Sequence, residues 1–391
     1  MNKNEYKSYL ITLTPLENFF FGSRKNSEPE KKKDYYIKSQ YFPQQTAVLG
    51  MLRQELLIQN KLFPLCSENR DKAVNLIGEK SFDPEEKEQN FGAIEGISLV
   101  LIYKDDHFFH SCPKDLGMTL QTEGGKVYLN VEDKRESKII LMKDFDSRKR
   151  PPDLMIANNS CEENLTYDKV FINNEQVGIK KGKSGQTDKE SYYKQVYLRM
   201  RKGFSYAFFL SLRTEYDSKP VVLKDNIICM GGEQSAFKME LTEVSEQSRG
   251  ENLKKLFAKT LPDFAEEKVI LYSDAFVDNQ ENQLLKLCKF AVTESIYFRN
   301  IRTNVRNTKK FYNLKPRDEE SEKTPYLGKR YNLLKRGSVF YVGDEGKDLE
   351  KIEKCLNKPH FQKIGYNYYK IYSKKNGYKN LSQNGEKKEK E

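Results

Sequence analysis

Residues 171–213 read FINNEQVGIKKGKSGQTDKESYYKQVYLRMRKGFSYAFFLSLR. Two strand-like segments flank a long basic tip that contains glycines, and the stretch ends in a strongly apolar strand over 204–212. This pattern predicts an inserted β-hairpin, over about 171–202, that leads directly into a buried strand. We therefore expect a fold built on β-sheets.

Toward the N-terminus, the sequence predicts a strand, an exposed loop and an amphipathic helix. Residues 6–13 alternate as a strand does, and Pro15 stops the alternation. Residues 22–36 are charged and contain Gly and Pro, which is typical of a loop. Pro43 then opens a helix. Its apolar stripe is Val48, Leu49, Leu52, Leu56 and Leu57, and the residues Gln45, Arg53 and Gln54 are not on this stripe.

The rest of the chain alternates between strand-like and helix-like segments. A hairpin is predicted over 96–112 and an irregular insertion over 124–170. A stretch that contains Gly-Gly follows at 226–242. The later predicted strands are one at 268–272, one that ends near 298, one at 338–342 and one at 364–372. Helices are predicted near 251–259, 281–290 and 349–356, and a flexible tail at 376–391. Together they predict an α+β protein of two domains, 1–215 and 216–375, each an antiparallel sheet covered by helices.

Composition narrows the classes of protein. The 391 residues include 68 Lys and Arg against 57 Asp and Glu, which gives a net charge of +11. The 23 Phe and 24 Tyr are too many aromatic residues for a fully disordered chain. No apolar run is long enough for a bilayer span and no signal peptide begins the sequence, so we expect a cytoplasmic protein without membrane insertion. The six cysteines lie far apart, which argues against disulfides and a zinc site. The basic surplus favours a polyanionic partner but is also typical of ordinary solubility.

No pattern predicts a catalytic centre. Residues 178–184 resemble a phosphate-binding loop, but three residues instead of four precede the Gly-Lys pair. His107 and His110 would point to opposite faces of a strand, so they do not form a metal site. Residues 231–233 lack the paired aspartates with which a polymerase holds two cations. We therefore expect no enzyme activity, no metal and no cofactor.

Two stretches combine basic and aromatic side chains. Residues 297–317 contain seven Lys and Arg with four aromatic residues, and residues 178–202 contain eight Lys and Arg together with Tyr192 and Tyr193. Guanidinium groups pair with phosphate oxygens and aromatic rings accept unstacked bases, so this mixture suits single-stranded RNA. The alternative for both stretches is a soluble basic loop that its aromatic residues anchor to the core.

Six motifs follow one another along the chain. They are TPLENFFFG at 14–22, YFPQQTAVLGMLR at 41–53, HFFHSCPKDL at 107–116, EQVGIKKGKSGQTDKESYYKQVYLR at 175–199, MGGEQSAF at 230–237 and KRGSVFYV at 335–342. Their order resembles that of the RAMP-type proteins of CRISPR effector complexes, and within them the third subunits of type III-B (Cmr) complexes. Type III-A complexes contain a sister subunit of similar fold.

The resemblance implies two ferredoxin-like (RRM-like) domains with an inserted hairpin that acts as a thumb against the CRISPR RNA. It implies a non-catalytic RNA-binding scaffold in antiviral defence that caps the 5′-tag end of the CRISPR RNA, next to the large polymerase-like subunit and a backbone RAMP subunit. The residues expected to contact RNA are Gln45, Arg53, Lys180, Lys181, Lys183, Tyr193, Arg199, Lys202, Arg299, Arg302 and Arg306.

The chain departs from the family pattern at three positions. Glu17 stands where the family has Asp, Gln176 where it often has Arg, and Gly365 alone represents a glycine-rich loop. Two other functions stay open. One is a RAMP-type endoribonuclease that matures CRISPR RNA through a histidine such as His107 or His110. The other is a protein-binding adaptor whose basic charge only confers solubility.

Overall fold

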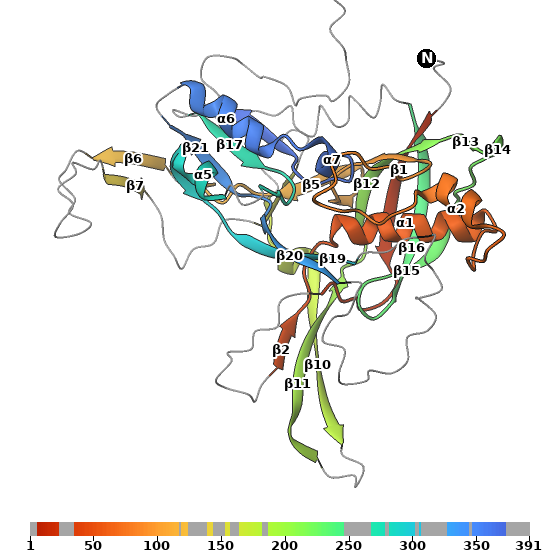
Figure 1. Ribbon diagram of the computed structural model, residues 1–391. Coiled ribbons are helices and arrows are strands. Elements are labelled where there is room, and N and C mark those ends of the chain that lie inside the picture. The colour runs from red at the N-terminus through yellow and green to blue at the C-terminus, as the bar shows by residue number, and fades with distance from the viewer. Residues whose placement is uncertain are drawn as a thin grey trace, which may run out of the picture.

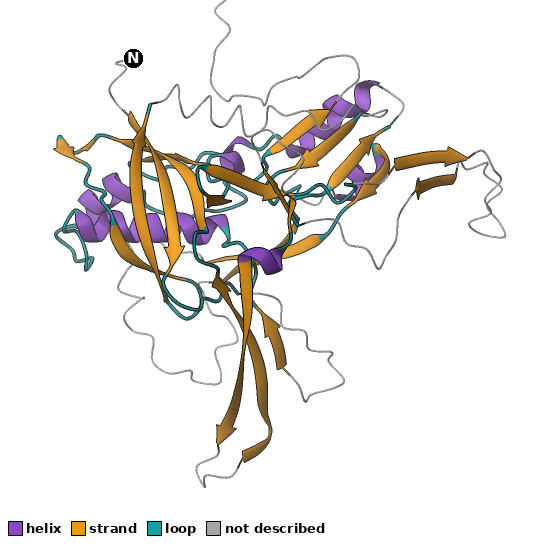
Figure 2. Ribbon diagram, turned by 180° about the vertical axis from the view of Figure 1, so that it is seen from behind, coloured by secondary structure: helices purple, strands orange, loops and turns teal. Residues whose placement is uncertain are grey.

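In the computed structural model, a body of sheets and helices carries a long arm of β-strands (Figures 1 and 2). The structure describes residues 6–22, 35–116, 119–123, 139–143, 153–156, 164–181, 187–245, 267–277, 281–301, 305, 327–343 and 346–372. Among the helices in these ranges, none has the length and apolar character needed to cross a bilayer.

The larger sheet has the N-terminal strand at its centre. β1 (Tyr6–Pro15) pairs antiparallel with β12 (Ser205–Arg213) on one side and with β16 (Ser235–Val244) on the other. The strand order is β15-β16-β1-β12-β4-β5-β8-β9, and β3 also pairs with β12. The other elements of this half are β3 (Ile94–Ile97), β4 (Leu101–Lys104), β5 (His107–Ser111), β8 (Leu154–Ile156), β9 (Asn164–Leu165), β13 (Glu215–Tyr216), β14 (Lys219–Pro220), β15 (Asn226–Met230), α1 (Gln45–Gln59), α2 (Arg70–Ile77) and α3 (Tyr167–Val170).

Helices α1 and α2 cover one face of this sheet, as the two opposite views show (Figures 1 and 2). Val48 and Leu52 of α1 are fully buried in a core that also contains Phe208 of β12, which confirms the predicted apolar stripe. However, Gln45 and Arg53 are also buried, although they are not on the stripe. Buried polar groups need hydrogen-bond partners, and the side chains of both residues donate to carbonyl groups of distant segments.

The predicted hairpin at 96–112 is confirmed by β4 and β5, which pair across Asp105 and Asp106. Both aspartates have positive φ angles, 48° and 62°, as a two-residue hairpin turn requires. In contrast, the prediction of an irregular insertion over 124–170 is wrong for the described residues. β8 pairs with β5 and β9 with β8, so this segment extends the sheet, while β6 (Thr119–Glu123) and β7 (Ile139–Lys143) form a separate hairpin.

The second sheet contains four antiparallel strands in the order β18-β21-β17-β22. Its elements are β17 (Lys268–Leu271), α5 (Glu281–Lys286), β18 (Cys288–Val292), β21 (Val339–Val342), α6 (Gly346–Leu356) and β22 (Tyr369–Tyr372). Leu284 of α5 and Ile352 of α6 are fully buried against Phe340 of β21, so both helices share a core with this sheet. The predicted helix at 281–290 ends at Lys286 because the next residues pair with β21.

A hairpin of β19 (Ser295–Ile301) and β20 (Leu327–Leu334) leaves the second sheet between β18 and β21. The short helix α7 (Pro359–Gln362) precedes β22. Phe361 of α7, Tyr366 and Leu333 of β20 are buried in the main core together with α1 and the larger sheet. Segments of the second half therefore contribute to the core of the larger sheet, while the second sheet keeps a separate core of its own.

The predicted α+β class with mainly antiparallel sheets is confirmed. The predicted division after residue 215 cuts the larger sheet, because β15 and β16 belong to that sheet. The predicted strand at 364–372 is shorter, since Gly365 and Asn367 have positive φ angles and pairing begins at Tyr369. The predicted helix near 251–259 and the tail at 376–391 lie outside the described residues.

Candidate nucleic-acid interface

The predicted basic hairpin forms an arm that projects from the body (Figure 1). β10 (Phe171–Lys181) pairs antiparallel with β11 (Thr187–Met200), and β2 (Tyr35–Lys38) adds to β11 in parallel. The extent predicted from the sequence, about 171–202, agrees with these strands. The arm therefore enters the larger sheet directly through β12.

The base of the arm is fixed to the body by two of the quoted motifs. The backbone N–H of Phe19 donates to the Leu198 carbonyl at 2.8 Å, and the Phe20 and Tyr197 ring centres are 5.6 Å apart. Gly231 has a φ of +93°, and a Cβ at this position would lie 2.7 Å from the Phe20 carbonyl oxygen. Only glycine permits this close approach, which places the Gly-Gly turn against the segment that holds the arm.

The cross-strand register divides the arm into two faces, because side chains alternate along a strand. We call one of them the polar face. It consists of Ile172, Asn174, Gln176 and Gly178 on β10, opposite Arg199, Tyr197, Gln195 and Tyr193 on β11. These eight positions include no acidic residue. The polar face therefore carries amides, tyrosines and an arginine without a compensating carboxylate of its own.

The opposite face, which we call the paired face, has its charge neutralised. Glu175 Oε2 lies 2.5 Å from Lys194 Nζ, and the same ammonium group is 5.8 Å from the ring centre of Tyr36. Closer to the body, Val196 and Leu198 of this face are buried in the protein interior. The paired face thus carries a compensated charge and contributes Val196 and Leu198 to the interior, so the polar face is the better surface for an anionic ligand.

Three of the predicted RNA-contacting residues lie on or beside the polar face. Tyr193 and Arg199 occupy it by register, and Arg199 is exposed. Lys202 is exposed in the turn after β11. Its neighbour Arg201 donates from Nε to the Asp168 carbonyl at 3.0 Å and so has an internal role.

Two of the other predicted lysines lie toward the tip of the arm. Lys180 and Lys181 are at the end of β10, while Lys183 lies outside the described residues. The backbone register shifts between Ile179 and Lys181, so the two faces defined above end before the tip.

Arg53 lies inside the body. Its Nη1 donates to the Lys80 carbonyl at 2.9 Å and its Nη2 to the Gly78 carbonyl at 3.0 Å. Burial lowers the pKa of this guanidinium to about 10, which still leaves it charged at neutral pH. With 8% of its surface exposed, Arg53 joins α1 to the segment after α2.

Gln45 is also internal, since Nε2 donates to the Gly365 carbonyl at 3.1 Å and 1% of the residue is exposed. It connects the start of α1 to the segment that leads into β22. The contact of Gln45 and Arg53 with RNA stays a prediction. Both residues are buried in the body and do not lie on the surface of the arm.

Arg299 is the described member of the second predicted basic cluster. It lies on β19, where the register places it directly opposite Arg330 of β20. Arg302 and Arg306 lie outside the described residues.

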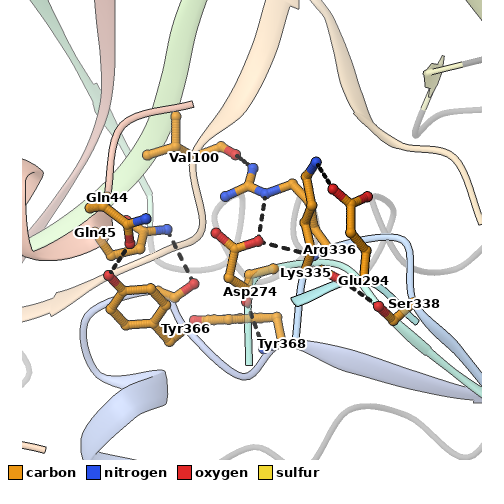
Figure 3. Close-up of polar contacts among 12 residues, drawn as sticks. Gln44, Gln45, Val100, Asp274, Glu294, Lys335, Arg336, Ser338, Tyr366 and Tyr368 are labelled. Atoms are coloured by element: carbon orange, nitrogen blue, oxygen red, sulfur yellow. Dashed lines mark hydrogen bonds and ion pairs between the residues drawn. The ribbon is translucent and has the colours of Figure 1, made fainter. Parts of the chain in front are cut away.

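A buried polar cluster joins the two halves of the chain (Figure 3). Arg336 Nε is 3.4 Å from Asp274 Oδ1, and Arg336 Nη1 donates to the Val100 carbonyl at 3.1 Å. The Tyr366 hydroxyl donates to Gln44 Oε1 at 2.8 Å. Beside them, Lys335 pairs with Glu294 at 2.7 Å. This junction fixes the β19–β20 hairpin and the second sheet against α1 and against the segment that precedes β4.

A second connection uses the turn in the HFFHSCPKDL motif. Asp115 Oδ2 accepts hydrogen bonds from Lys268 Nζ and from the Tyr341 hydroxyl, both at 2.5 Å. Gly337 has a φ of +81°, and a Cβ there would lie 2.5 Å from the Cys112 carbonyl oxygen. The motif in the first half and KRGSVFYV in the second half are therefore in contact, and both have structural roles here.

The two clustered histidines are separated by the fold. His107 is exposed and its Nδ1 is 2.6 Å from the Asp105 carbonyl. His110 is buried against the Tyr272 ring at 4.7 Å, and burial lowers its pKa to about 4. A histidine with this pKa, shielded from solvent, is a poor general acid or base at neutral pH. Among the described residues, no group of three His, Cys, Asp or Glu residues could hold a metal ion.

Sequence reasoning missed the polar face as a unit and the junction around Arg336. The alternation of Tyr193, Gln195, Tyr197 and Arg199 along one strand was a usable signal, since residues two apart share a face. The burial of Arg336 had a weaker signal, namely an arginine at the start of an apolar strand. Its partner Asp274 is 62 residues away, a separation that no local pattern reveals.

Comparisons with known proteins point to one family. Residues 156–372, more than half of the chain, match the model of the family described as CRISPR-associated protein (Cas_Cmr3). No curated protein matches the chain. Among solved structures, it is similar to a chain in a cryo-EM structure of the type III-B Cmr-beta bound to cognate target RNA, with 13% identity over 93% of this chain and 96% of that chain and a TM-score of 0.47.

Two further structures are similar. A chain in the type III-B Cmr-beta bound to cognate target RNA and AMPPnP, state 1, has 14% identity over 93% of this chain and 96% of that chain, with a TM-score of 0.45. A chain in the apo state of the type III-B Cmr-beta has 13% identity over 62% of this chain and 98% of that chain, with a TM-score of 0.26.

Proposed function

The chain belongs to the Cas_Cmr3 family of CRISPR-associated proteins, and from this premise we propose that it is a non-catalytic RNA-binding scaffold subunit of a type III-B CRISPR (Cmr) interference complex. It caps the 5′-tag end of the CRISPR RNA, and the β10–β11 arm is the element that holds the RNA. It works in the cytoplasm, next to the large polymerase-like subunit and a backbone RAMP subunit.

The observation that carries this proposal is the unequal chemistry of the two arm faces. On the paired face, Glu175 neutralises Lys194 at 2.5 Å. The polar face has Arg199, two tyrosines and three amides at six of its eight positions, and none of the eight is an acidic residue. Phosphate groups favour arginine without a competing carboxylate, and tyrosine rings and amides suit the faces and edges of unpaired bases. A surface needed only for solubility has no reason to concentrate this chemistry on one face.

The arm is also suited to hold a ligand in a fixed orientation. It enters the larger sheet through β12, and the Phe19–Leu198 and Phe20–Tyr197 contacts fix its base. Because the base is packed, the polar face keeps its direction relative to the body. A scaffold that sets the position of an RNA end needs this stiffness more than it needs a cavity.

As part of the same proposal, the chain consists of two ferredoxin-like units. The second unit has the order β17–α5–β18–β21–α6–β22, with sheet order β18-β21-β17-β22, which is the β-α-β-β-α-β arrangement. In the first unit, β16-β1-β12-β4 is the equivalent strand order, with α1 after β1. Between β12 and β16, the described residues contain strands β13 to β15 instead of the second helix. We place the division between the units at 246–266.

The absence of catalysis is proposed from the state of the histidines. His110 is buried with a pKa of about 4, and His107 lies on the opposite side of the same strand, exposed. Neither residue combines accessibility with a neighbouring general acid or base among the described contacts. Site-specific cleavage of repeat RNA that is lost on His107→Ala would contradict this part of the proposal.

The experiment compares two single substitutions at adjacent positions of β10. Gln176→Glu adds a negative charge to the polar face, and Val177→Glu adds the same charge to the paired face, where Val177 is 55% exposed. The affinity of the full-length protein for a fluorescent single-stranded RNA of the CRISPR repeat sequence is measured by anisotropy. A charge placed near phosphate is worth about 1 kcal/mol, so Gln176→Glu is expected to weaken binding about fivefold.

Val177→Glu is the matched control and is expected to change the affinity less than about twofold, because its side chain is on the other side of the arm. Equal effects of the two substitutions would contradict the proposal that RNA binds to the polar face. No RNA binding by the wild-type chain, alone or in the assembled complex, would leave the protein-binding adaptor as the better function.

A further inference from the structure

The β19–β20 hairpin has a second surface suited to RNA, and this inference rests on the proposed RNA-binding function. We propose that the outward face of this hairpin, formed by Tyr297, Arg299, Arg330 and Asn332, binds the phosphate backbone of the same single-stranded RNA. The hairpin therefore acts as a second finger beside the β10–β11 arm.

The topology gives the two hairpins equivalent places. β19 and β20 leave the second sheet between β18 and β21, which are the second and third strands of its β-α-β-β-α-β order. β10 and β11 lie between β4 and β12, the corresponding strands of the first half, and they follow β5, β8 and β9, which extend the larger sheet at this point. An insertion that carries RNA contacts in one unit thus has a counterpart at the same point of the other unit.

The register separates the inner and outer faces of the β19–β20 hairpin. Ile296 lies opposite Leu333, and Phe298 lies opposite Tyr331. Leu333 is fully buried in the main core, and the Tyr331 ring packs edge-on against Phe276 with centres 5.5 Å apart. Leu333 and Tyr331 therefore lie on the inner face, which is held by the body.

The outer face consists of the alternate pairs, Tyr297 opposite Asn332 and Arg299 opposite Arg330. Tyr297 is 47% exposed, and Arg330 and Asn332 are also exposed. Their exposure follows from the burial of the inner pairs, because side chains alternate along each strand. Arg330, Tyr297 and Asn332 thus present a basic, an aromatic and an amide side chain together, and Arg299 is placed opposite Arg330 by the register alone.

The Arg299–Arg330 pair is the feature that points to an anion. Arg299 and Arg330 are directly opposite in the register, and like charges at directly opposite positions of an antiparallel pair destabilise the pairing. The two strands, SIYFRNI and LGKRYNLL, contain three basic residues and no acidic residue. A phosphate group bound between the two guanidinium groups would relieve the repulsion through charge-assisted hydrogen bonds.

The anion is assigned to RNA because of the neighbouring pair. Tyr297 and Asn332 come two residues before and after the arginines on the same face. An exposed ring and an amide next to a phosphate site are suited to a base that follows the bound phosphate along the strand. An acidic protein segment would use the arginines but would gain nothing specific from this combination.

The test uses the full chain and the labelled repeat-sequence RNA. The double substitution Arg299→Ala and Arg330→Ala is compared with Arg213→Ala, an exposed arginine of β12 that lies 3.9 Å from Glu95. If both arginines bind phosphate, the slope of log K against log salt decreases by about 1.4, since each phosphate contributes about 0.7 for single strands. Arg213→Ala is expected to leave the slope unchanged. Tyr297→Ala is expected to weaken binding but to leave the slope unchanged as well.

Thermal unfolding by circular dichroism confirms that each variant is folded before binding is compared. The inference is overturned if the folded double variant binds RNA with the slope and affinity of the wild type. If this variant also fails to assemble with the other subunits, the face binds a protein and not RNA. The arm variant Gln176→Glu separates the two proposals. Weaker binding by this variant together with unchanged binding by the double variant rejects the second finger alone, whereas no RNA binding by the wild type rejects the function itself.

Discussion

Arg336 and Asp274 form an ion pair in the interior of the molecule. Arg336 Nε lies 3.4 Å from Asp274 Oδ1, and their side chains are 5% and 8% exposed. The same guanidinium donates to the Val100 carbonyl and lies 4.0 Å over the Phe42 ring centre. One side chain of the second half therefore contacts two separate segments of the first half, which makes the relative placement of the arm and the β19–β20 hairpin depend on it.

Replacing Arg336 with Met is expected to destabilise the protein by about 3–5 kcal/mol, because the Asp274 carboxylate stays buried without its partner. Urea unfolding of the full chain measures the change. Lys7→Ala is the control, since Lys7 pairs with Glu243 at 2.9 Å but their side chains are 48% and 58% exposed. Breaking this exposed pair is expected to have little effect on stability, because solvent screens the attraction. Similar losses in the two variants would show that the buried pair has no special weight.

Arg53 is expected to contribute to stability and not to RNA binding. Arg53→Met removes hydrogen bonds to the Gly78 and Lys80 carbonyls and is expected to cost about 2–3 kcal/mol of stability. The affinity of the folded variant for repeat RNA is expected to stay within about twofold of wild type, because the guanidinium is 8% exposed. The opposite result, normal urea stability with weaker RNA binding, would support the RNA contact that the family resemblance implies.

Local patterns in the sequence predicted the elements that depend on neighbours along the chain. The basic arm, the apolar strand β12 and helix α1 follow from alternation, from the glycine-containing tip and from the stripe after Pro43. The α5 helix was predicted too long because its last residues also fit a strand, and pairing with β21 decides in favour of the strand.

The positions of the functional side chains depended on partners that are distant in the sequence. Gln45 finds its acceptor at Gly365, 320 residues away, and Arg53 finds one 25 residues away, so their burial was not visible in the helical stripe. Tyr193 and Arg199 were identified individually, but the polar face became evident only with the register of β10 against β11. Which charges are neutralised, as Lys194 is by Glu175, is likewise a property of pairing.

Unfolding at acid pH is expected to report on His110. Burial lowers its pKa from 6.5 to about 4, so the unfolded chain binds a proton that the folded chain does not between these values. The contribution of His110 to the free energy of unfolding is therefore fully present above pH 6.5. It falls by on the order of 3 kcal/mol as the pH decreases toward 4. The difference in urea midpoint between wild type and His110→Phe is measured from pH 4 to 7. A constant difference would exclude His110 as a source of the pH dependence.

Gln176 lies on the polar face, at a position where the family resemblance leads us to expect Arg. Gln176→Arg is expected to strengthen binding of repeat RNA about fivefold and to steepen the salt dependence by about 0.7, as one added phosphate contact predicts. The control is Val177→Arg, which adds the same charge to the paired face and is expected to have a smaller effect. Anisotropy titrations between about 50 and 200 mM salt give both values. Equal gains for the two variants would indicate attraction by total charge alone.

The cross-strand pair Arg299–Arg330 leads to a prediction in the absence of RNA. Arg330→Gln removes the repulsion and is expected to stabilise the protein by about 0.2–1 kcal/mol at low salt. At 1 M salt the Debye length is about 3 Å, so the gain should disappear. Arg213→Gln is the control, because Arg213 lies 3.9 Å from a carboxylate oxygen of Glu95 and its loss removes an attraction instead. Thermal unfolding at both salt concentrations distinguishes the cases, since a gain that persists at 1 M salt would come from strand propensity and not from charge.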